Sequence, residues 1–310
     1  MGRLTPCAFV FAGQGAQAAG MGSSLFESNE AAHEVFMRAE EARPGTQRQC
    51  FEGTAEELRE TRNTQPCLWT VEMAAAAALS RAGITPQAVA GFSLGEMAAL
   101  TYGGACTFED GLALVMKRAA HMSDAAQASA HETAMAAVMK LEADVAEEMC
   151  APYPHLWPVN YNCPGQTVVS GYADELRAFA DDVKQARGLA RVLNVSGAFH
   201  SPLMQNAAHN FANDLAGVAF SEPDIPVYAN VTAEVYPAER IAALLEMQMA
   251  SPVKWQATIE RMHAEQGIST FIEIGPGKTL SGFIKRILPD AVTLHVEDAE
   301  SLAATLEAWG

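Results

Sequence analysis

The sequence predicts an α/β protein with short, buried strands. Apolar runs at 8–11, 88–90 and 270–274 have the length of strands that are buried on both faces. Each run leads into a glycine-containing turn, and helix-like stretches with apolar residues on one side lie between the runs. Buried strands that alternate with helices are typical of a parallel sheet covered by helices.

Composition and charge limit the functions that the chain can have. Its 310 residues are 49% hydrophobic and 18% charged, which suits one large domain or two unequal ones. The net charge of −17 opposes non-specific binding to nucleic acid or to anionic membrane lipid. An acidic protein partner would therefore have to dock on a local basic patch.

The cysteines and the apolar segments predict a soluble, cytoplasmic protein. The opening apolar run, 7–12, is too short for the core of a signal peptide, and no stretch reaches the length of a membrane span. No CxxC pair occurs, which favours reduced thiols over disulfides or a zinc site. The six cysteines are Cys7, Cys50, Cys67, Cys106, Cys150 and Cys163.

Residues 89–100 contain a G-x-S-x-G motif, with Ser93 between Gly91 and Gly95. A buried run enters the motif and an alanine-rich helical run leaves it, as in a nucleophile elbow. In so tight a turn the flanking residues can hardly carry side chains. We therefore predict Ser93 as a nucleophile and the Leu94 backbone N–H, at the positive end of the next helix, as an oxyanion donor.

A second glycine-rich stretch, 12–22, follows the first strand. Gly13, Gly15 and Ala18 have the spacing of a dinucleotide-binding loop, so a nucleotide-binding module is a competing hypothesis. That fold requires a second strand ending in an acidic residue about 20 residues later, and a helix-like stretch stands there instead. A loop beside the elbow could equally present the Gln14 backbone N–H as the second oxyanion donor.

Several helices are predicted before and after the elbow. The first three cover 28–43, 54–60 and 67–82. Ser28 is the predicted cap of the first, and Gly83 is expected to close the third. Another helix opens at Thr107, and its i, i+4, i+7 core stripe is Phe108, Leu112, Val115, Ala119 and Met122. Arg118 lies beside that stripe, where it could grip a carboxylate in a cleft or remain a solvated surface group.

Between 131 and 197 the pattern changes to strand, helix, two strands, helix and strand. The predicted elements cover 133–141, 142–150, 157–162, 167–171, 174–187 and 189–195. This βαββαβ order is that of a ferredoxin-like unit. We predict a small subdomain, 131–197, inserted into a core formed by 1–130 and 198–310.

His200 follows the insert and directly precedes Ser201 and Pro202. Serine followed by proline is a helix start, so His200 stands just outside a helix N-terminus. The helix dipole disfavours an imidazolium there and should keep His200 neutral, as a general base for Ser93 requires. No Asp or Glu stands out as the third member of a triad.

The last third of the chain predicts a strand over 227–231, a helix over 238–249 and a strand over 270–274. The GKT sequence at 277–279 resembles the end of a phosphate-binding loop. That motif needs glycine where Ile272 stands, so we interpret the segment as a turn and helix cap.

At this point the chain resembles the malonyl-CoA:acyl carrier protein transacylases of fatty acid synthesis, over nearly its whole length. Seven segments carry the resemblance in order: FAGQGAQ, GFSLGE, the Arg118 helix, NYNCPGQTVVSG, GAFHSPLM, Gln248 before SPVKW, and EIGPGKTLSGFIKR. The resemblance implies a hydrolase-like α/β core with a parallel sheet and a ferredoxin-like insert.

The resemblance also implies a reaction. Ser93, with His200 as base, would be acylated by malonyl-CoA and would pass the malonyl group to the phosphopantetheine thiol of acyl carrier protein in a ping-pong cycle. A main-chain carbonyl near Gln248 would orient His200 in place of an acid. No metal and no cofactor are implied.

Three further site residues follow from the same resemblance. Backbone N–H groups of Gln14 and Leu94 would hold the oxyanion, and Arg118 would pair with the free malonyl carboxylate. Phe92, before the nucleophile, departs from the family's usual histidine and leaves acyl selectivity open. The GAFH sequence at 197–200 resembles the malonyl-selecting version, so malonyl remains the expected group.

Two alternatives remain for the activity: an acyltransferase of a polyketide pathway, and a serine esterase or thioesterase based on the elbow alone. For carrier docking we expect a basic patch, because an acidic carrier would otherwise be repelled. Its candidates are Lys184, Arg187, Arg191, Lys278, Lys285 and Arg286. The sequence does not determine the oligomeric state, and we expect a monomer.

Overall fold

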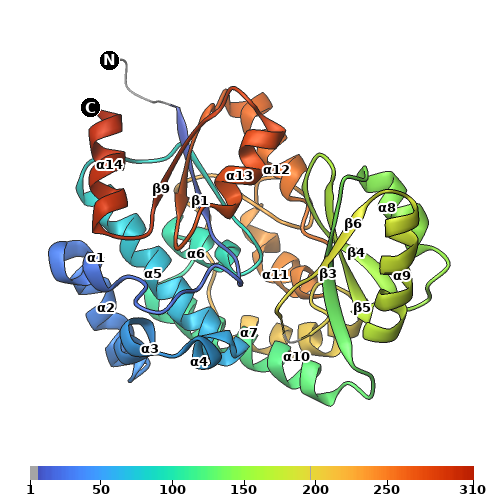
Figure 1. Cartoon of the computed structure of the whole chain (residues 1–310). Helices are drawn as coiled ribbons and strands as arrows, with labels where there is room; N and C mark the ends of the chain where they lie inside the picture. Colours follow the sequence, from blue (N-terminus) through green and yellow to red (C-terminus); the bar gives the residue numbers. More distant parts are fainter. Residues whose placement is uncertain (1–5, 196) are drawn as a thin grey trace.

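Two β-sheets organise the chain in the computed structural model, which describes residues 6–195 and 197–310 (Figure 1). In these residues the larger sheet has five strands in the order β7-β2-β1-β8-β9, and every pairing between them is parallel. Its strands are β1 (Cys7–Phe11), β2 (Ala88–Gly91), β7 (Val227–Tyr228), β8 (Thr270–Ile274) and β9 (Val292–Val296). The predicted α/β class is confirmed.

The central strands are buried because most of their side chains are apolar. Every residue of β1 is fully buried, and β2 and β8 pair with its two edges. Strands covered on both faces read as unbroken apolar runs, which is why they were predictable. The charged exception is Glu273 of β8, a buried acid. Its carboxylate accepts the N–H groups of Leu280 and Ser281 at the start of α13 (Thr279–Ile287).

Helices cover both faces of this sheet. Those between β1 and β2 are α1 (Ser23–Ser28), α2 (Glu30–Ala42), α3 (Thr46–Glu52), α4 (Ala55–Arg59) and α5 (Thr61–Arg81). After β2 come α6 (Gly95–Tyr102) and α7 (Phe108–Ala128). The C-terminal part adds the 3₁₀ turns η1 (Pro202–Met204) and η2 (Ala238–Arg240), and the helices α10 (Gln205–Leu215), α11 (Ile241–Met249), α12 (Trp255–Gln266), α13 and α14 (Ala299–Trp309). None of the helices in the described residues is long and apolar enough to cross a membrane.

The connection after β1 contradicts the nucleotide-binding alternative. In a dinucleotide fold the glycine-rich turn opens a helix that leads at once to a parallel strand. Here the loop runs on to α1 at Ser23, and four more helices precede β2. Gly13 instead packs against the elbow, since a Cβ on it would lie 2.8 Å from the Phe92 backbone oxygen.

The second sheet is antiparallel and lies beside the first (Figure 1). Its order is β4-β5-β3-β6, and α8 and α9 pack against it, which is the ferredoxin-like arrangement that the sequence predicts. The elements are β3 (Thr133–Met139), α8 (Ala143–Cys150), β4 (Leu156–Cys163), β5 (Gln166–Tyr172), α9 (Ala173–Gln185) and β6 (Leu189–Val192). The subdomain boundaries at 131 and 197 stay a prediction.

Several predicted element ends were wrong, each for a local reason. Ser28 is not the cap of α2: it ends α1, and Asn29, in extended conformation, accepts the Ala32 N–H at 3.1 Å. Helix α5 begins six residues before the predicted Cys67, with Pro66 inside it. The strand predicted over 227–231 stops at Tyr228, because the chain turns back through an Ala233 N–H bond to the Ala229 oxygen.

The core stripe of α7 was predicted correctly. Its five apolar residues are all buried, so this face of α7 packs in the core. Three elements that the sequence analysis did not predict complete the C-terminal part, namely α12, β9 and α14.

Glu72 of α5 is an unusual core residue. It is fully buried, and within the described residues neither carboxylate oxygen has a hydrogen-bond partner. It packs closely against Gly275 in the loop after β8: a Cβ added to that glycine would lie only 3.1 Å from the Glu72 Cγ. Burial raises the pKa of the Glu72 carboxyl well above its ordinary value of 4.5, which favours the neutral acid in the folded state.

We predict that Glu72→Met stabilises the protein more at pH 8 than at pH 5. In the unfolded chain Glu72 ionises near pH 4.5, whereas the folded state keeps the proton to higher pH, so stability falls as the pH rises between the two pKa values. The free energy of unfolding in urea should rise by about 1–3 kcal/mol at pH 8. Glu34→Met, at an exposed position of α2, is the control. An equal loss of stability at both pH values would contradict the prediction.

Candidate active site

Ser93 sits in a turn that only glycine neighbours permit. Its φ is 55°, in the left-handed region, between β2 and α6. A Cβ on Gly91 would lie 1.8 Å from the Gly95 carbonyl carbon, and one on Gly95 would lie 2.3 Å from the Phe11 oxygen. The strand and the helix therefore touch through their backbones, and the strained turn presents the serine side chain beyond the end of the strand.

Asn230, which follows β7, holds the elbow from the side. Its side-chain oxygen accepts the Ser93 N–H at 2.8 Å, and its amide donates to the Gly91 oxygen at 2.7 Å. The strained backbone thus has hydrogen-bond partners although it is buried. Asn230 was not predicted as a site residue, because a lone asparagine after a short strand has no distinguishing pattern.

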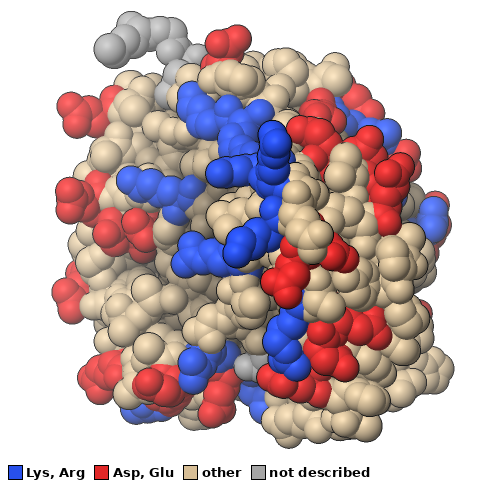
Figure 2. Space-filling view, turned by 45° about the vertical axis from the view of Figure 1, so that its right-hand side comes forward, with Lys and Arg blue, Asp and Glu red and all other residues tan. Residues whose placement is uncertain are grey.

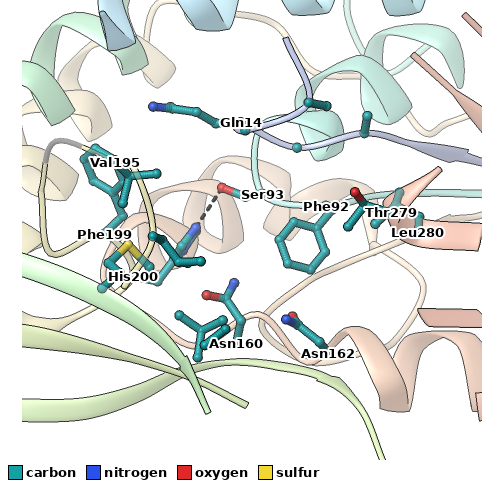
Figure 3. Close-up of a pocket in the computed structure, with 18 of the residues that line it drawn as sticks. Gln14, Phe92, Ser93, Asn160, Asn162, Val195, Phe199, His200, Thr279 and Leu280 are labelled. Carbon is teal, nitrogen blue, oxygen red and sulfur yellow. Dashed lines mark hydrogen bonds between the residues drawn. The ribbon is translucent and has the colours of Figure 1, made fainter. Parts of the chain in front are cut away.

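His200 faces Ser93 across the site (Figure 3). Its Nδ1–H donates to the Gln248 main-chain oxygen at 2.8 Å, which leaves Nε2 to accept the Ser93 hydroxyl at 2.7 Å. His200 has φ 61° and directly precedes Ser201, whose side chain accepts the Leu203 N–H at the start of η1. Burial, and then the positive charge of Arg118, lower the pKa of His200 to about 4. The imidazole is therefore neutral at physiological pH and able to accept a proton.

Arg118 lies beside the nucleophile and is not a solvated surface group. It is 1% exposed, and Nη2 donates to Ser93 Oγ at 3.1 Å. The other acceptors are neutral amide oxygens, Gln65 Oε1 and Gln248 Oε1, both at 2.8 Å. Burial lowers the pKa of Arg118 to about 10, so it stays charged at pH 7. Among the described residues no carboxylate forms a salt bridge with this guanidinium, although buried charges are normally paired.

Gln248 joins the two sides of the site. Its main-chain oxygen accepts from His200. Its side-chain amide nitrogen donates to the Ser93 main-chain oxygen at 2.6 Å and to Glu96 Oε2 at 2.7 Å. Glu96 is fully buried and accepts in addition the Tyr236 hydroxyl and the Asn230 N–H. Burial raises the pKa of Glu96 to about 7, against the lowering effect of these hydrogen bonds. The side-chain part of this network was not predicted.

The two backbone donors assigned to an oxyanion hole are available. Within the described residues, neither the Gln14 N–H nor the Leu94 N–H makes a hydrogen bond. The Gln14 side chain is fixed separately, since it donates to Thr61 Oγ1 at 3.1 Å. Both N–H groups are thus free to bind an incoming negative oxygen.

A cavity of about 270 Å³ opens in front of Ser93 and His200 and reaches both sheets. Its walls are mostly apolar, with Phe92 on one side and Val195 and Phe199 on the other (Figure 3). The ring of Phe92 packs edge-on against Trp255, with centroids 5.5 Å apart. An aromatic surface therefore stands at the position directly before the nucleophile.

Basic side chains form a band on the face shown in Figure 2. Three residues of the predicted patch lie at the two ends of α13, a helix that lines the cavity. Lys278 directly precedes the helix, and Lys285 and Arg286 lie in its last turn. Arg286 reaches the antiparallel sheet, donating to the Pro164 oxygen and to Gln166 Oε1. The other three candidates, Lys184, Arg187 and Arg191, lie at the end of α9, in the turn after it and in β6.

Comparison with known proteins agrees with the geometry. The acyl transferase domain family matches residues 8–304. The malonyl CoA-acyl carrier protein transacylase of Bacillus subtilis (strain 168) is 38% identical over 312 residues, covering 98% of this chain and 97% of that protein. The crystal structure of a malonyl CoA-acyl carrier protein transacylase from Clostridium perfringens Atcc 13124 has 38% identity and a TM-score of 0.92, with 98% and 97% covered.

A further solved structure contains a malonyl-transacylase in complex with its type II PKS acyl-carrier protein. It has 33% identity and a TM-score of 0.93, and the match covers 98% of this chain and 100% of that one. The predicted family is therefore confirmed. Since these matches run almost from end to end and the residues around Ser93 form one connected site, the chain belongs to the malonyl CoA-acyl carrier protein transacylase family.

Proposed function

We propose that this protein is an [acyl-carrier-protein] S-malonyltransferase, which moves a malonyl group from malonyl-CoA to the phosphopantetheine thiol of acyl carrier protein for fatty acid synthesis. The observation that carries the proposal is the buried, charged Arg118, which has no carboxylate partner in the described part of the chain and lies 3.1 Å from the Ser93 hydroxyl. A malonyl thioester brings a carboxylate to a position near the serine that attacks it. Neutral amide oxygens can give up their place on the guanidinium to that carboxylate.

The first half of the cycle acylates the serine. As Ser93 Oγ attacks the thioester carbonyl carbon, its proton passes to His200 Nε2, 2.7 Å away. The carbonyl oxygen becomes an oxyanion, which the backbone N–H groups of Gln14 and Leu94 stabilise. Collapse of this intermediate breaks the carbon–sulfur bond, and the coenzyme A thiolate leaves with the proton from His200.

The second half returns the enzyme to its starting state. The carrier thiol gives its proton to His200, and its sulfur attacks the carbonyl carbon of malonyl-Ser93. Ser93 Oγ leaves and regains the proton from His200. Both halves use the same base and the same oxyanion donors, so the residues need no rearrangement and the cycle needs no metal or cofactor.

The carrier protein would dock where basic residues border the cavity. Lys278 directly precedes the cavity-lining residues Thr279 and Leu280, and the band in Figure 2 offers positive charge on an otherwise acidic chain. The related malonyl-transacylase solved with a type II PKS carrier makes supply of a polyketide pathway the second candidate for the physiological role. We place the protein in the cytoplasm, where its six cysteines, all free, would stay reduced.

The central test is acylation by malonyl-CoA without acceptor. Intact-mass spectrometry should show one malonyl adduct that lasts until holo acyl carrier protein is added. Ser93→Ala should give no adduct, whereas Ser221→Ala, at an exposed position, should behave as the wild type. Rapid loss of the adduct to water would instead identify a thioesterase.

Arg118→Ala should remove the preference for malonyl-CoA over acetyl-CoA. Loss of charge-assisted hydrogen bonds to the carboxylate should cost malonyl acylation about 1.5–3 kcal/mol, or roughly ten- to hundred-fold, and acetyl acylation much less. Single-turnover rates with the two thioesters measure the effect. Arg62→Ala is the control, since Arg62 is an exposed arginine paired with Asp124. A persisting preference would rule Arg118 out as the carboxylate ligand.

Acylation should stay fast down to low pH. Because burial lowers the pKa of His200 from 6.5 to about 4, the neutral base persists as the pH falls through 6.5 and is lost only near pH 4. The single-turnover acylation rate, measured from pH 8 to pH 4.5 with circular dichroism as a check of folding, should therefore show no midpoint near 6.5. A midpoint there would contradict the assigned base or its buried, neutral state.

A further inference from the structure

Two cysteines outside the active site lie against each other. Cys50 is in α3 and Cys67 is in α5, and both side chains are fully buried. The Cys50 thiol donates to the Cys67 main-chain oxygen at 3.7 Å, which places the two cysteines in direct contact. No step of the proposed transfer reaction uses either of them.

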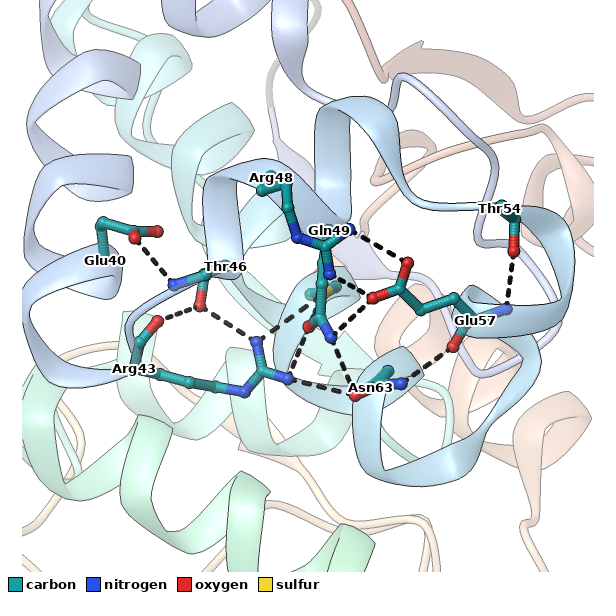
Figure 4. Close-up of polar contacts among 10 residues, drawn as sticks. Glu40, Arg43, Thr46, Arg48, Gln49, Thr54, Glu57 and Asn63 are labelled. Atoms are coloured by element: carbon teal, nitrogen blue, oxygen red, sulfur yellow. Dashed lines mark hydrogen bonds and ion pairs between the residues drawn. The ribbon is translucent and has the colours of Figure 1, made fainter.

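A single layer of polar side chains covers Cys67. The layer consists of Arg43, Gln49 and Asn63, all of which are partly exposed (Figure 4). The Cys67 thiol donates to Gln49 Oε1 at 3.5 Å, and Arg43 Nη1 is 4.0 Å from the sulfur. Arg43 also donates to Gln49 Oε1 at 2.6 Å and to Asn63 Oδ1 at 3.3 Å. Solvent is thus one side chain away from the sulfur.

This surrounding makes Cys67 the more acidic thiol of the pair. The neighbouring Cys50 side chain, and after it the positive charge of Arg43, lower the pKa of Cys67 in spite of its burial, while the pKa of Cys50 is raised. Cys7 and Cys150, which lack such neighbours, have pKa values raised by burial to about 12. The thiolate is the reactive form of cysteine, so Cys67 differs from these two buried thiols in reactivity.

The element that carries Cys50 is small enough to move. Helix α3 has seven residues, and its left-handed N-cap residue, Gly45, offers no side-chain cap. Its first turn is held instead by the Glu40 carboxylate, which accepts the Gly45 and Gln47 N–H groups. Short surface helices open locally at low cost, and a shift of α3 would let the two sulfurs approach to the bond length of about 2.05 Å.

We propose that Cys50 and Cys67 form a redox-active dithiol, which a hydroperoxide converts into an intramolecular disulfide. The Cys67 thiolate attacks the peroxide oxygen, the O–O bond breaks and the sulfur is oxidised to sulfenic acid, while the other oxygen leaves as hydroxide. The Cys50 sulfur then attacks the Cys67 sulfur. The S–S bond forms, and the sulfenic oxygen leaves as water with the Cys50 proton.

The test is oxidation of the reduced protein by hydrogen peroxide at pH 7.5, followed by unfolding in denaturant, alkylation with N-ethylmaleimide and mass spectrometry. The intact mass should fall by two hydrogen atoms, two thiols should escape alkylation, and peptide mapping should find the 50–67 cross-link. The pair should react at least about ten-fold faster than the other thiols, in line with its thiolate content. Dithiothreitol should restore the starting mass. The four thiols that stay free to react with maleimide are Cys7, Cys106, Cys150 and Cys163.

Three variants separate the steps. In Cys50→Ala the reaction should stop at Cys67 sulfenic acid, which dimedone traps. Cys67→Ala should leave Cys50 unoxidised, and Cys163→Ala, which removes a buried thiol elsewhere, should leave disulfide formation unchanged. Oxidation of all six thiols at similar rates, or a cross-link between another pair, would overturn the proposal. Because the peptide map of the wild type decides this alone, a variant that fails to fold does not affect the outcome.

Discussion

The backbone of Ser93, held at positive φ where β2 touches α6, is the constraint on which the site depends. Direct backbone packing between Gly91 and Gly95 brings the helix N-terminus behind the serine, and no group in residues 6–195 or 197–310 accepts the Leu94 N–H. Such a conformation costs roughly 1–3 kcal/mol and persists only when its surroundings enforce it. Asn230 and Gln248 provide that enforcement through three hydrogen bonds to the elbow backbone.

The second organising feature is the way in which the buried charges are kept apart. Gln248 stands between Arg118 and Glu96: its oxygen accepts from the arginine, and its nitrogen donates to the acid. A direct ion pair would neutralise the guanidinium and leave little for a ligand. Because the amide lies between them, Arg118 keeps an uncompensated positive charge at the nucleophile, while the charge of Glu96 is stabilised by hydrogen bonds from Tyr236 and Asn230.

Helix α5 connects several of these features. Gln65, near its start, holds Arg118; Cys67, two residues on, forms the thiol pair; and Glu72 lies buried against the loop that leads to α13. A helix interior is less stable than an apolar one when it carries a polarised thiol and a buried acid that has no hydrogen-bond partner among the described residues. Helix α5, which holds Arg118 in the active site through Gln65, is thus less stable than an apolar helix would be.

The sequence by itself determined what depends on neighbouring residues. Glycines around Ser93, the apolar stripe of α7 and the βαββαβ order follow from local sterics and periodicity, and the seven family segments identified the residues that meet at the site. Tertiary structure alone decided the partners of Arg118, the grip of Asn230 on the elbow and the burial of Glu72, because these contacts join residues far apart in the chain and leave no periodic pattern. It also set the start of α5 at Thr61, before Pro66, where the Thr64 side chain donates to the Leu58 and Glu60 main-chain oxygens.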